Sequence, residues 1–109
     1  MAMQHAVSGE PVCVLPPANV PGDRQTVALF KTEELEVMRL VLAKGKSMPA
    51  HKVAGDITVQ CLEGVICFNS DGKDQTLAVG DMLYLAGGVT HSLTALEDAC
   101  ALVHIVLRK

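Results

Sequence analysis

The chain has no tryptophan, and aromatic residues make up only 3% of its 109 residues. It also has no run of basic residues, and its net charge at pH 7 is −3. Nucleic-acid-binding proteins present a cationic face, often with aromatic rings that stack on bases. These two shortages therefore predict that nucleic acids are not partners of this protein.

Long apolar segments and paired cysteines are also missing. No stretch approaches the roughly 20 apolar residues that span a bilayer as a helix, and the N-terminus lacks the pattern of a secretory signal. The sequence thus predicts no membrane association. The four cysteines form no CxxC pair and lack zinc-site spacing: Cys13, Cys61, Cys67 and Cys100. Free thiols in a reducing compartment are the simplest interpretation, which predicts a cytoplasmic location.

Hydrophobic residues, in contrast, are abundant. They make up 50% of the chain, against 19% for charged residues, as in a globular domain. A chain of this length forms one domain with one core. Because a small domain has a large surface for its volume, so many apolar residues should leave an exposed patch on a monomer. We therefore predict a homodimer.

Prolines divide the chain into two parts. Four of the five prolines lie in residues 1–25, which are predicted to form an irregular arm over the domain or over a partner subunit. Val12–Leu15 is the one segment of this arm that could form a short edge strand. His5 also lies in the arm and is interpreted as incidental.

From Thr26 onward, short β-rich segments alternate with turn residues. Leu35–Ala43 also fits a helical period, but Gly45 ends it and closely spaced strands follow, which favours a strand. Asp71-Gly72 predicts a tight hairpin. The predicted strands are 26–32, 35–43, 57–62, 65–69, 75–79, 82–85, 90–96 and 100–107. Such spacing without a helix indicates a β-sandwich or barrel.

Two glycine-framed histidines carry a resemblance to a known family. His51 lies between Gly45 and Gly64, and His91 follows Gly80 in a second frame, with fifteen residues between Gly64 and Gly80. These frames resemble the two motifs of the cupin superfamily, at the short spacing of small single-domain, RmlC-like members. The resemblance implies an all-β fold, a single cupin-type jelly-roll β-barrel (double-stranded β-helix), over residues 26–109.

The resemblance also implies a depleted metal site. In metal-binding cupins the first motif supplies two histidines separated by one residue and then a carboxylate or glutamine, and the second supplies one histidine. His51 and His91 match two of these ligands, whereas Val53 and Ile57 stand at the other two positions. The two histidines are interpreted either as ligands of one divalent metal ion or as a hydrogen-bonded pair at the barrel mouth.

Other residues could complete or line this pocket. Asp56 could reach the acidic position if a bulge at Ala54-Gly55 changes the strand register. His104 becomes a third ligand only if it faces the cavity, and a core or interface histidine is the favoured interpretation. Cys61 and Tyr84 are expected to line the pocket, Cys61 because it shares the parity of Ile57.

Two functions from different classes fit this pattern. The first is a binding domain that takes a small ligand in the barrel, with His51 and His91 as its polar groups. The second, implied by the resemblance, is a metal-dependent enzyme of the oxygenase, isomerase or decarboxylase type with an atypical histidine centre. An accessory subunit of a partner protein is a third hypothesis. The missing ligands favour the binding domain.

Overall fold

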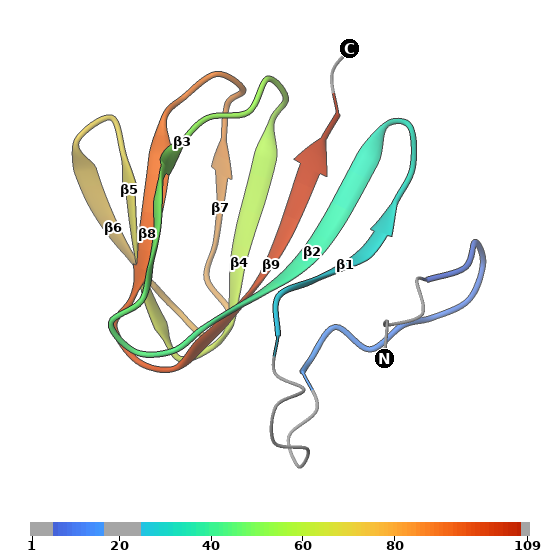
Figure 1. The fold of residues 1–109 in the computed structure, drawn as a ribbon, viewed down its shortest axis with the longest axis horizontal. Coiled ribbons are helices and arrows are strands. Elements are labelled where there is room, and N and C mark those ends of the chain that lie inside the picture. The colour runs from blue at the N-terminus through green and yellow to red at the C-terminus, as the bar shows by residue number, and fades with distance from the viewer. Residues whose placement is uncertain (1–5, 17–24, 108–109) are drawn as a thin grey trace.

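The structure is a computed structural model that describes residues 6–16 and 25–107. These residues form nine β-strands and no helix (Figure 1). The strands are β1 Val27–Lys31, β2 Leu35–Leu42, β3 Ser47–His51, β4 Ile57–Glu63, β5 Val65–Ser70, β6 Lys73–Ala78, β7 Met82–Leu85, β8 His91–Ala95 and β9 Ala99–Val106. Within this part of the chain, no helix is long and apolar enough to cross a membrane.

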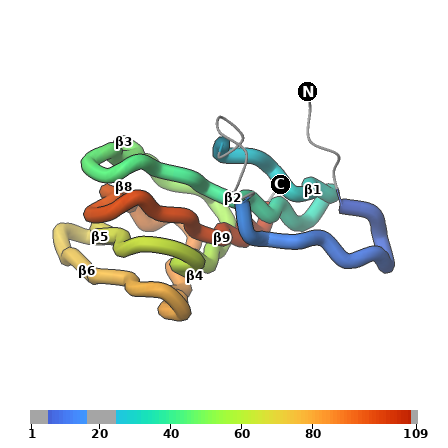
Figure 2. Tube along the Cα trace, turned by 90° about the horizontal axis from the view of Figure 1, so that it is seen from below, coloured from blue at the N-terminus to red at the C-terminus, as the bar shows by residue number. Residues whose placement is uncertain are grey.

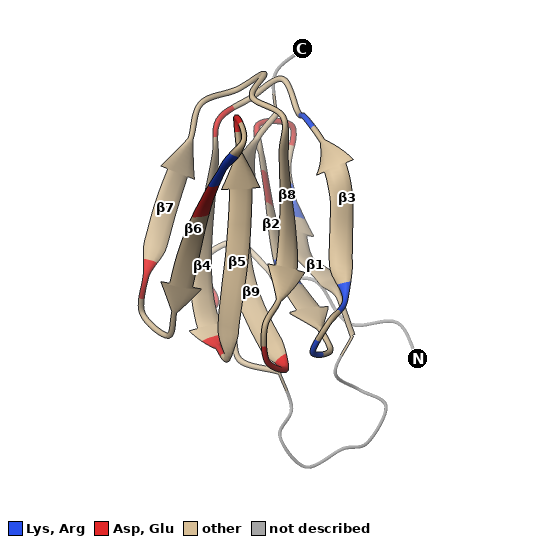
Figure 3. Ribbon diagram, turned by 90° about the vertical axis from the view of Figure 1, so that its left-hand side faces the viewer, with Lys and Arg blue, Asp and Glu red and all other residues tan. Residues whose placement is uncertain are grey.

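The strands form two antiparallel sheets that face each other. One has five strands in the order β1-β2-β9-β4-β7, and the other has four in the order β3-β8-β5-β6. Figure 3 shows the four-stranded sheet in front of the five-stranded one. The chain passes from one sheet to the other between β2 and β3, β3 and β4, β4 and β5, β6 and β7, β7 and β8, and β8 and β9. The predicted all-β jelly-roll fold is thus confirmed.

All eight predicted strands are present, but β3 was not among them. Its burial does not alternate along the strand, and it contains Pro49, which normally argues against a strand. Proline is tolerated here because β3 is an edge strand of its sheet, where a missing N–H leaves no neighbouring strand unpaired. The pairing of β3 with β8 is also interrupted by a register shift between Met48 and His51.

The arm contains no strand in its described residues, so the prediction of a strand at Val12–Leu15 is wrong. Instead, the Ala6 N–H donates to the Leu29 carbonyl at 2.9 Å, and Val14 packs on an apolar cluster on the outer face of the five-stranded sheet. The Arg39 guanidinium donates to the Leu15 carbonyl at 3.2 Å. Figure 2 shows the arm beside the β1–β2 end of the molecule. His5 lies outside the described residues.

Local turn chemistry agrees with the sequence. Asp71 and Gly72 have φ angles of 52° and 76°. Two successive positive φ angles are what a two-residue type I′ hairpin requires, and this turn joins β5 to β6. The turn after β6 is held by Asp81, whose carboxylate accepts the Ala78 N–H at 3.0 Å.

The core lies between the two sheets. Alternation along β9 shows the principle: Ala101, Val103 and Ile105 point inward, whereas Leu102 and His104 point to the outer face. The largest fully buried side chains of the inner core are Phe68, Ile66 and Val59, each at most 1% exposed. One end of this interior is left open as a pocket.

Candidate functional site

The structure brings His51 and His91 together as direct partners in the pairing of β3 with β8. Their ring centroids are 4.4 Å apart, with an angle of 55° between the ring planes. Met48 pairs with Leu93, so β3 has one more residue than β8 between the two pairs. This bulge keeps Met48 and His51 on the same inner face, although residues three apart on a regular strand face opposite ways.

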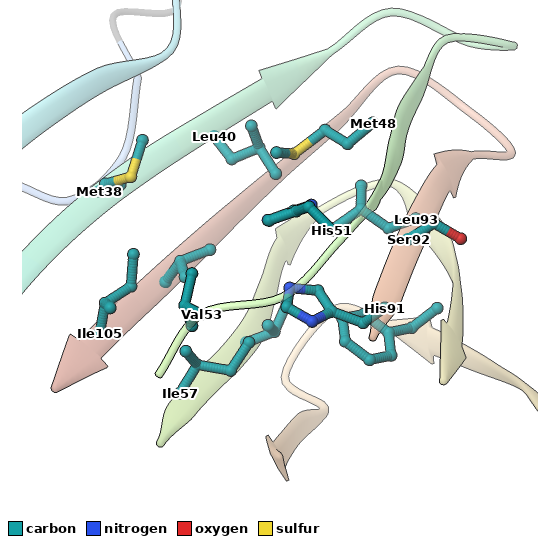
Figure 4. A pocket seen from close by; sticks show the side chains of 13 residues that line it. Met38, Leu40, Met48, His51, Val53, Ile57, His91, Ser92, Leu93 and Ile105 are labelled. Carbon is teal, nitrogen blue, oxygen red and sulfur yellow. The ribbon is translucent and has the colours of Figure 1, made fainter. Parts of the chain in front are cut away.

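The two imidazoles have different surroundings. The His91 side chain is 6% exposed, and its ring stacks on Phe68 with a centroid distance of 5.6 Å and an angle of 12° between the planes. His51 is exposed, so the pocket opens to solvent on its side. Figure 4 shows both rings directed into the same space between the sheets.

Both rings are held by the same kind of hydrogen bond. The Nδ1 atom of His51 lies 3.1 Å from the Pro49 carbonyl oxygen, and that of His91 lies 3.0 Å from the Val89 carbonyl oxygen. A carbonyl can only accept, so each Nδ1 carries the hydrogen and donates it. In the neutral rings, each Nε2 is therefore an unprotonated acceptor. Two backbone carbonyls thus set the tautomer of both imidazoles that line the pocket.

The rest of the pocket is apolar. Its volume is about 80 Å³, and its walls are mainly aliphatic, with the thioethers of Met38 and Met48 and the ring of Phe68. Ser92 also contributes, but Figure 4 shows its hydroxyl directed away from the other lining side chains. None of the lining residues is a lysine, arginine, aspartate or glutamate. The imidazoles are therefore the polar side-chain groups available to a ligand.

The structure places Val53 and Ile57 on the pocket wall. The positions at which the family resemblance would put a histidine and a carboxylate therefore do face the cavity. Ile57 is 5% exposed, and neither side chain can coordinate a metal. At these two positions the side chains face the pocket, but they carry no metal-donor atoms.

Cys61 and Tyr84 do not line the pocket, contrary to the sequence-based expectation. Cys61 does point inward, but it lies deeper in the core, is 0% exposed and donates its thiol hydrogen to the carbonyls of Glu63 and Gly64, each at 3.4 Å. Burial raises the pKa of this thiol. Tyr84 is 63% exposed, because Leu83 and Leu85 are the residues of β7 that pack on the core.

His104 and Asp56, the two residues that could have completed a metal site, make hydrogen bonds outside the pocket. His104 lies between Val103 and Ile105, which line the pocket, and so points to the opposite face of its sheet. There its Nδ1 lies 3.1 Å from the Thr58 hydroxyl. Asp56 accepts the Gly87 N–H at 2.9 Å and does not line the pocket, so no register change brings it to the acidic position.

Asp56 instead belongs to a clamp at the mouth that the sequence did not reveal. The Gly88 N–H donates to the Val53 carbonyl at 2.8 Å, beside the bond from Gly87 to Asp56. The backbones approach so closely that a Cβ on Gly87 would collide with the Ala54 carbonyl. The Gly87-Gly88 pair was a visible signal of such an approach, but its partner is more than thirty residues away.

The described residues do not fit a divalent metal centre of the cupin type. Residues 6–16 and 25–107 contain no group of three or more His, Cys, Asp or Glu side chains that could hold a metal ion. Zinc sites in enzymes use three protein ligands and a water, and structural ones use four. Two imidazoles among aliphatic side chains fall short of both.

Comparisons with known proteins agree with this fold. The sequence matches no protein-family model and no curated protein. The structure is similar to a cupin superfamily protein from Desulfitobacterium hafniense, with a TM-score of 0.78 and 18% identity over 99% of this chain and 100% of that one. A conserved Streptococcus pyogenes protein of unknown function gives a TM-score of 0.76 and 20% identity, covering 100% and 99% of the two chains.

An enzyme is also among the similar structures. The salicylate 1,2-dioxygenase from Pseudoaminobacter salicylatoxidans, solved in complex with gentisate, gives a TM-score of 0.69 and 18% identity. The match covers 73% of this chain but 24% of the dioxygenase. Identities this low establish the fold and not the activity. The protein thus has the jelly-roll fold of these cupin structures, with Val53 and Ile57 at two positions where the family resemblance places metal ligands.

Proposed function

We propose that the protein binds a small, largely apolar molecule in the barrel through the Nε2 atoms of His51 and His91. The observation that carries this proposal is the matched pair of Nδ1 contacts to the Pro49 and Val89 carbonyls, at 3.1 and 3.0 Å. These contacts fix two hydrogen-bond acceptors in an otherwise apolar pocket. A few convergent polar groups on an apolar wall are typical of small-molecule sites.

The polarity and size of the pocket narrow the ligand class. Two acceptors favour a ligand with O–H or N–H donors, such as a phenol, an alcohol or a diol. A carboxylate is disfavoured, because no lining residue offers a permanent positive charge to compensate its desolvation. The volume of about 80 Å³ is smaller than the roughly 150 Å³ of an apolar cavity that holds benzene. Part of any aromatic ligand therefore lies at the open mouth.

Fragment binding tests this proposal. A set of small phenols, alcohols and diols would be screened by ligand-observed NMR against the wild type and against H51A and H91A. His104→Ala is the matched control, since it removes a histidine on the outer face of the same barrel. We expect binding to be lost in both pocket variants and kept in the control. Equal binding by all four proteins would refute the proposed site.

The alternative is a metal-dependent enzyme of the oxygenase, isomerase or decarboxylase type. The dioxygenase among the similar structures gives a reason to test it. Such a centre needs donors beyond His51 and His91, which the described residues do not supply. Elemental analysis of the purified protein distinguishes the two candidates. About one equivalent of a divalent metal, lost in both histidine variants, would favour the enzyme over the binding domain.

We further propose that the protein is a homodimer in the cytoplasm. Support for a dimer comes from the outer face of the five-stranded sheet, where Tyr84 and Met82 are 63% and 60% exposed. Tyr84, Thr58 and His104 form a row across β7, β4 and β9. Four free cysteines are compatible with a reducing compartment.

The opposite sheet differs, and this supplies a control. Its outer face carries polar pairs such as Ser47 with Thr94, whose hydroxyls are 2.7 Å apart. Light scattering should therefore report a dimer for the wild type and for Thr76→Glu on this polar face, but a monomer for Tyr84→Glu. A monomeric wild type at high micromolar concentration would contradict the dimer.

A further inference from the structure

We propose that the same pocket binds a soft monovalent metal ion, Cu(I), through the Nε2 atoms of His51 and His91 and the thioether sulfur of Met48. This inference rests on the two acceptors of the proposed function. It adds a sulfur atom that a small-molecule site does not need. The two ideas therefore differ in their dependence on Met48.

The tautomer of each histidine is the first argument for a metal. Metal-binding histidines almost always donate their second ring N–H to a carboxylate, a backbone carbonyl or water, which orients the ring and makes the other nitrogen a better ligand. Both pocket histidines have this arrangement, with Pro49 and Val89 as the carbonyl partners. The two rings lie side by side, with centroids 4.4 Å apart, and both line the same pocket.

The second argument is the charge of the ion, because the cost of burying an ion in an apolar pocket is lower for a monovalent than for a divalent ion. The Born cost of desolvation scales with the square of the charge, so a monovalent ion costs about a quarter as much as a divalent ion of equal radius. No carboxylate or thiolate lines the pocket to compensate a second charge. Neutral ligands in apolar surroundings therefore favour a singly charged ion.

Ligand softness and coordination number are the third argument. Thioether sulfur is a soft donor that selects Cu(I), and imidazole also suits copper. Cu(I) has a filled d shell and is stable with two or three ligands, so it does not need the donors that Val53 and Ile57 fail to supply. The absence of these donors, which disfavours a divalent centre, is compatible with this ion.

Met48 is placed to be the third ligand. The bulge in β3 puts it on the inner face with His51, one pair further along the ladder with β8. Figure 4 shows its thioether on the His51 side of the pocket, whereas Met38 lies farther away on the opposite wall. The methionine side chain has three rotatable bonds and adapts readily to its surroundings. Met38 therefore serves as a matched control with the same chemistry.

The test must first remove competing thiols. Cys13 is exposed and Cys67 is half-buried, so both would take up Cu(I). Cys61 and Cys100 are 0% exposed and stay in place. In a C13S/C67S background, Cu(I) would be titrated without oxygen against the chromophoric chelator bicinchoninate. Fragment binding would be measured on the same proteins.

We expect about one equivalent of bound Cu(I) in the C13S/C67S background. Outer-shell changes alone cost metal sites about 10–100-fold in affinity, so M48L should weaken binding at least tenfold, while M38L stays within about twofold. Leucine conserves the volume of methionine, so folding should persist. X-ray absorption at the copper edge gives a second measurement, and it should detect one sulfur neighbour that M48L removes.

The outcomes separate the two proposals. Absence of Cu(I) binding in the thiol-depleted background, or equal effects of M48L and M38L, would overturn this inference. If fragments still required both histidines, the proposed small-molecule site would survive that result. If H51A and H91A changed neither fragment nor copper binding, both proposals would fail together.

Discussion

Restoring the two missing donors tests whether the pocket keeps the geometry of a metal centre. Val53 and Ile57 both line it, at the positions where the family resemblance places a histidine and a carboxylate. We therefore predict that the double variant V53H/I57E acquires a divalent metal site with His51 and His91. The prediction depends on the direction of these two side chains and not on any activity.

The metal-free variant should be less stable than the wild type. Ile57 is 5% exposed, so replacing it forfeits about 1.5–3 kcal/mol of apolar burial. The introduced carboxyl adds about 1–3 kcal/mol for a buried polar group without a partner. The sum, about 2.5–6 kcal/mol, is a large fraction of the roughly 5–15 kcal/mol that stabilises a typical domain. Metal that binds the folded state offsets about 2.7 kcal/mol at 100 times its Kd.

Urea unfolding followed by circular dichroism, with and without Mn²⁺, measures this effect. Mn²⁺ is chosen because it prefers oxygen and imidazole ligands and binds thiols weakly. Val53→His with Thr58→Glu is the matched control, because Thr58 lies next to Ile57 but points to the outer face. A metal-dependent rise in stability should occur in the test variant alone. No rise, or the same rise in the control, would refute the assignment of these positions to a ligand-competent space.

Three further predictions concern the scaffold. Gly64→Ala should lower the free energy of unfolding by at least about 3 kcal/mol, because its Cβ would collide with the Asp98 carbonyl. Gly72→Ala should lower it by only about 1–2 kcal/mol, the cost of an alanine in the left-handed region, because its Cβ meets open space. Equal costs in chemical unfolding would contradict the collision. Asp56→Ala should speed hydrogen exchange at the Gly87 amide by removing its acceptor, and an unchanged rate would argue against the clamp. Burial raises the pKa of Cys61 above its ordinary 9.0, so the folded state holds this proton more tightly. The contribution of this thiol to folding stability is present below about pH 9 and is lost as the pH rises through the folded pKa. Above pH 9, the urea midpoint should therefore fall less steeply with pH in Cys61→Ala than in the wild type. Identical slopes in the two proteins would refute the linkage.

Short β-rich segments between turn residues made most of the fold predictable from the sequence. These segments identified eight strands, and the ligand positions implied by the family resemblance placed Val53 and Ile57 on the cavity wall. The prediction for Cys61 failed because side-chain parity alone is insufficient there. Cys61 has the inward parity of Ile57, but parity gives the face of a strand and not the depth along the barrel. The pocket occupies the Ile57 end, and Cys61 lies in the closed core beyond it.

The bulge in β3 explains how Met48 comes to share a face with His51. In a regular strand Met48 and His51, three residues apart, point to opposite faces, so strand parity alone cannot place both in one pocket. The extra residue in β3 is visible only once Met48 pairs with Leu93 and His51 with His91. Irregular pairing is set by contacts with β8 and leaves no signal in β3 itself. This pairing is why the thioether of Met48 lies on the pocket wall with the two histidines.

Val53 and Ile57 make the pocket wall apolar at two positions where the family resemblance places metal ligands, and this bears on both occupants that we propose. Both Nε2 atoms are still oriented by backbone carbonyls, a constraint that depends on the main chain and survives the side-chain changes at Val53 and Ile57. Losing a carboxylate removes a negative charge from the ligand set, and losing an imidazole removes a donor. A divalent ion would then carry two uncompensated charges into an apolar space, which is costly. A neutral hydrogen-bond donor brings no charge and Cu(I) only one, so the same substitutions favour the two occupants proposed for this site.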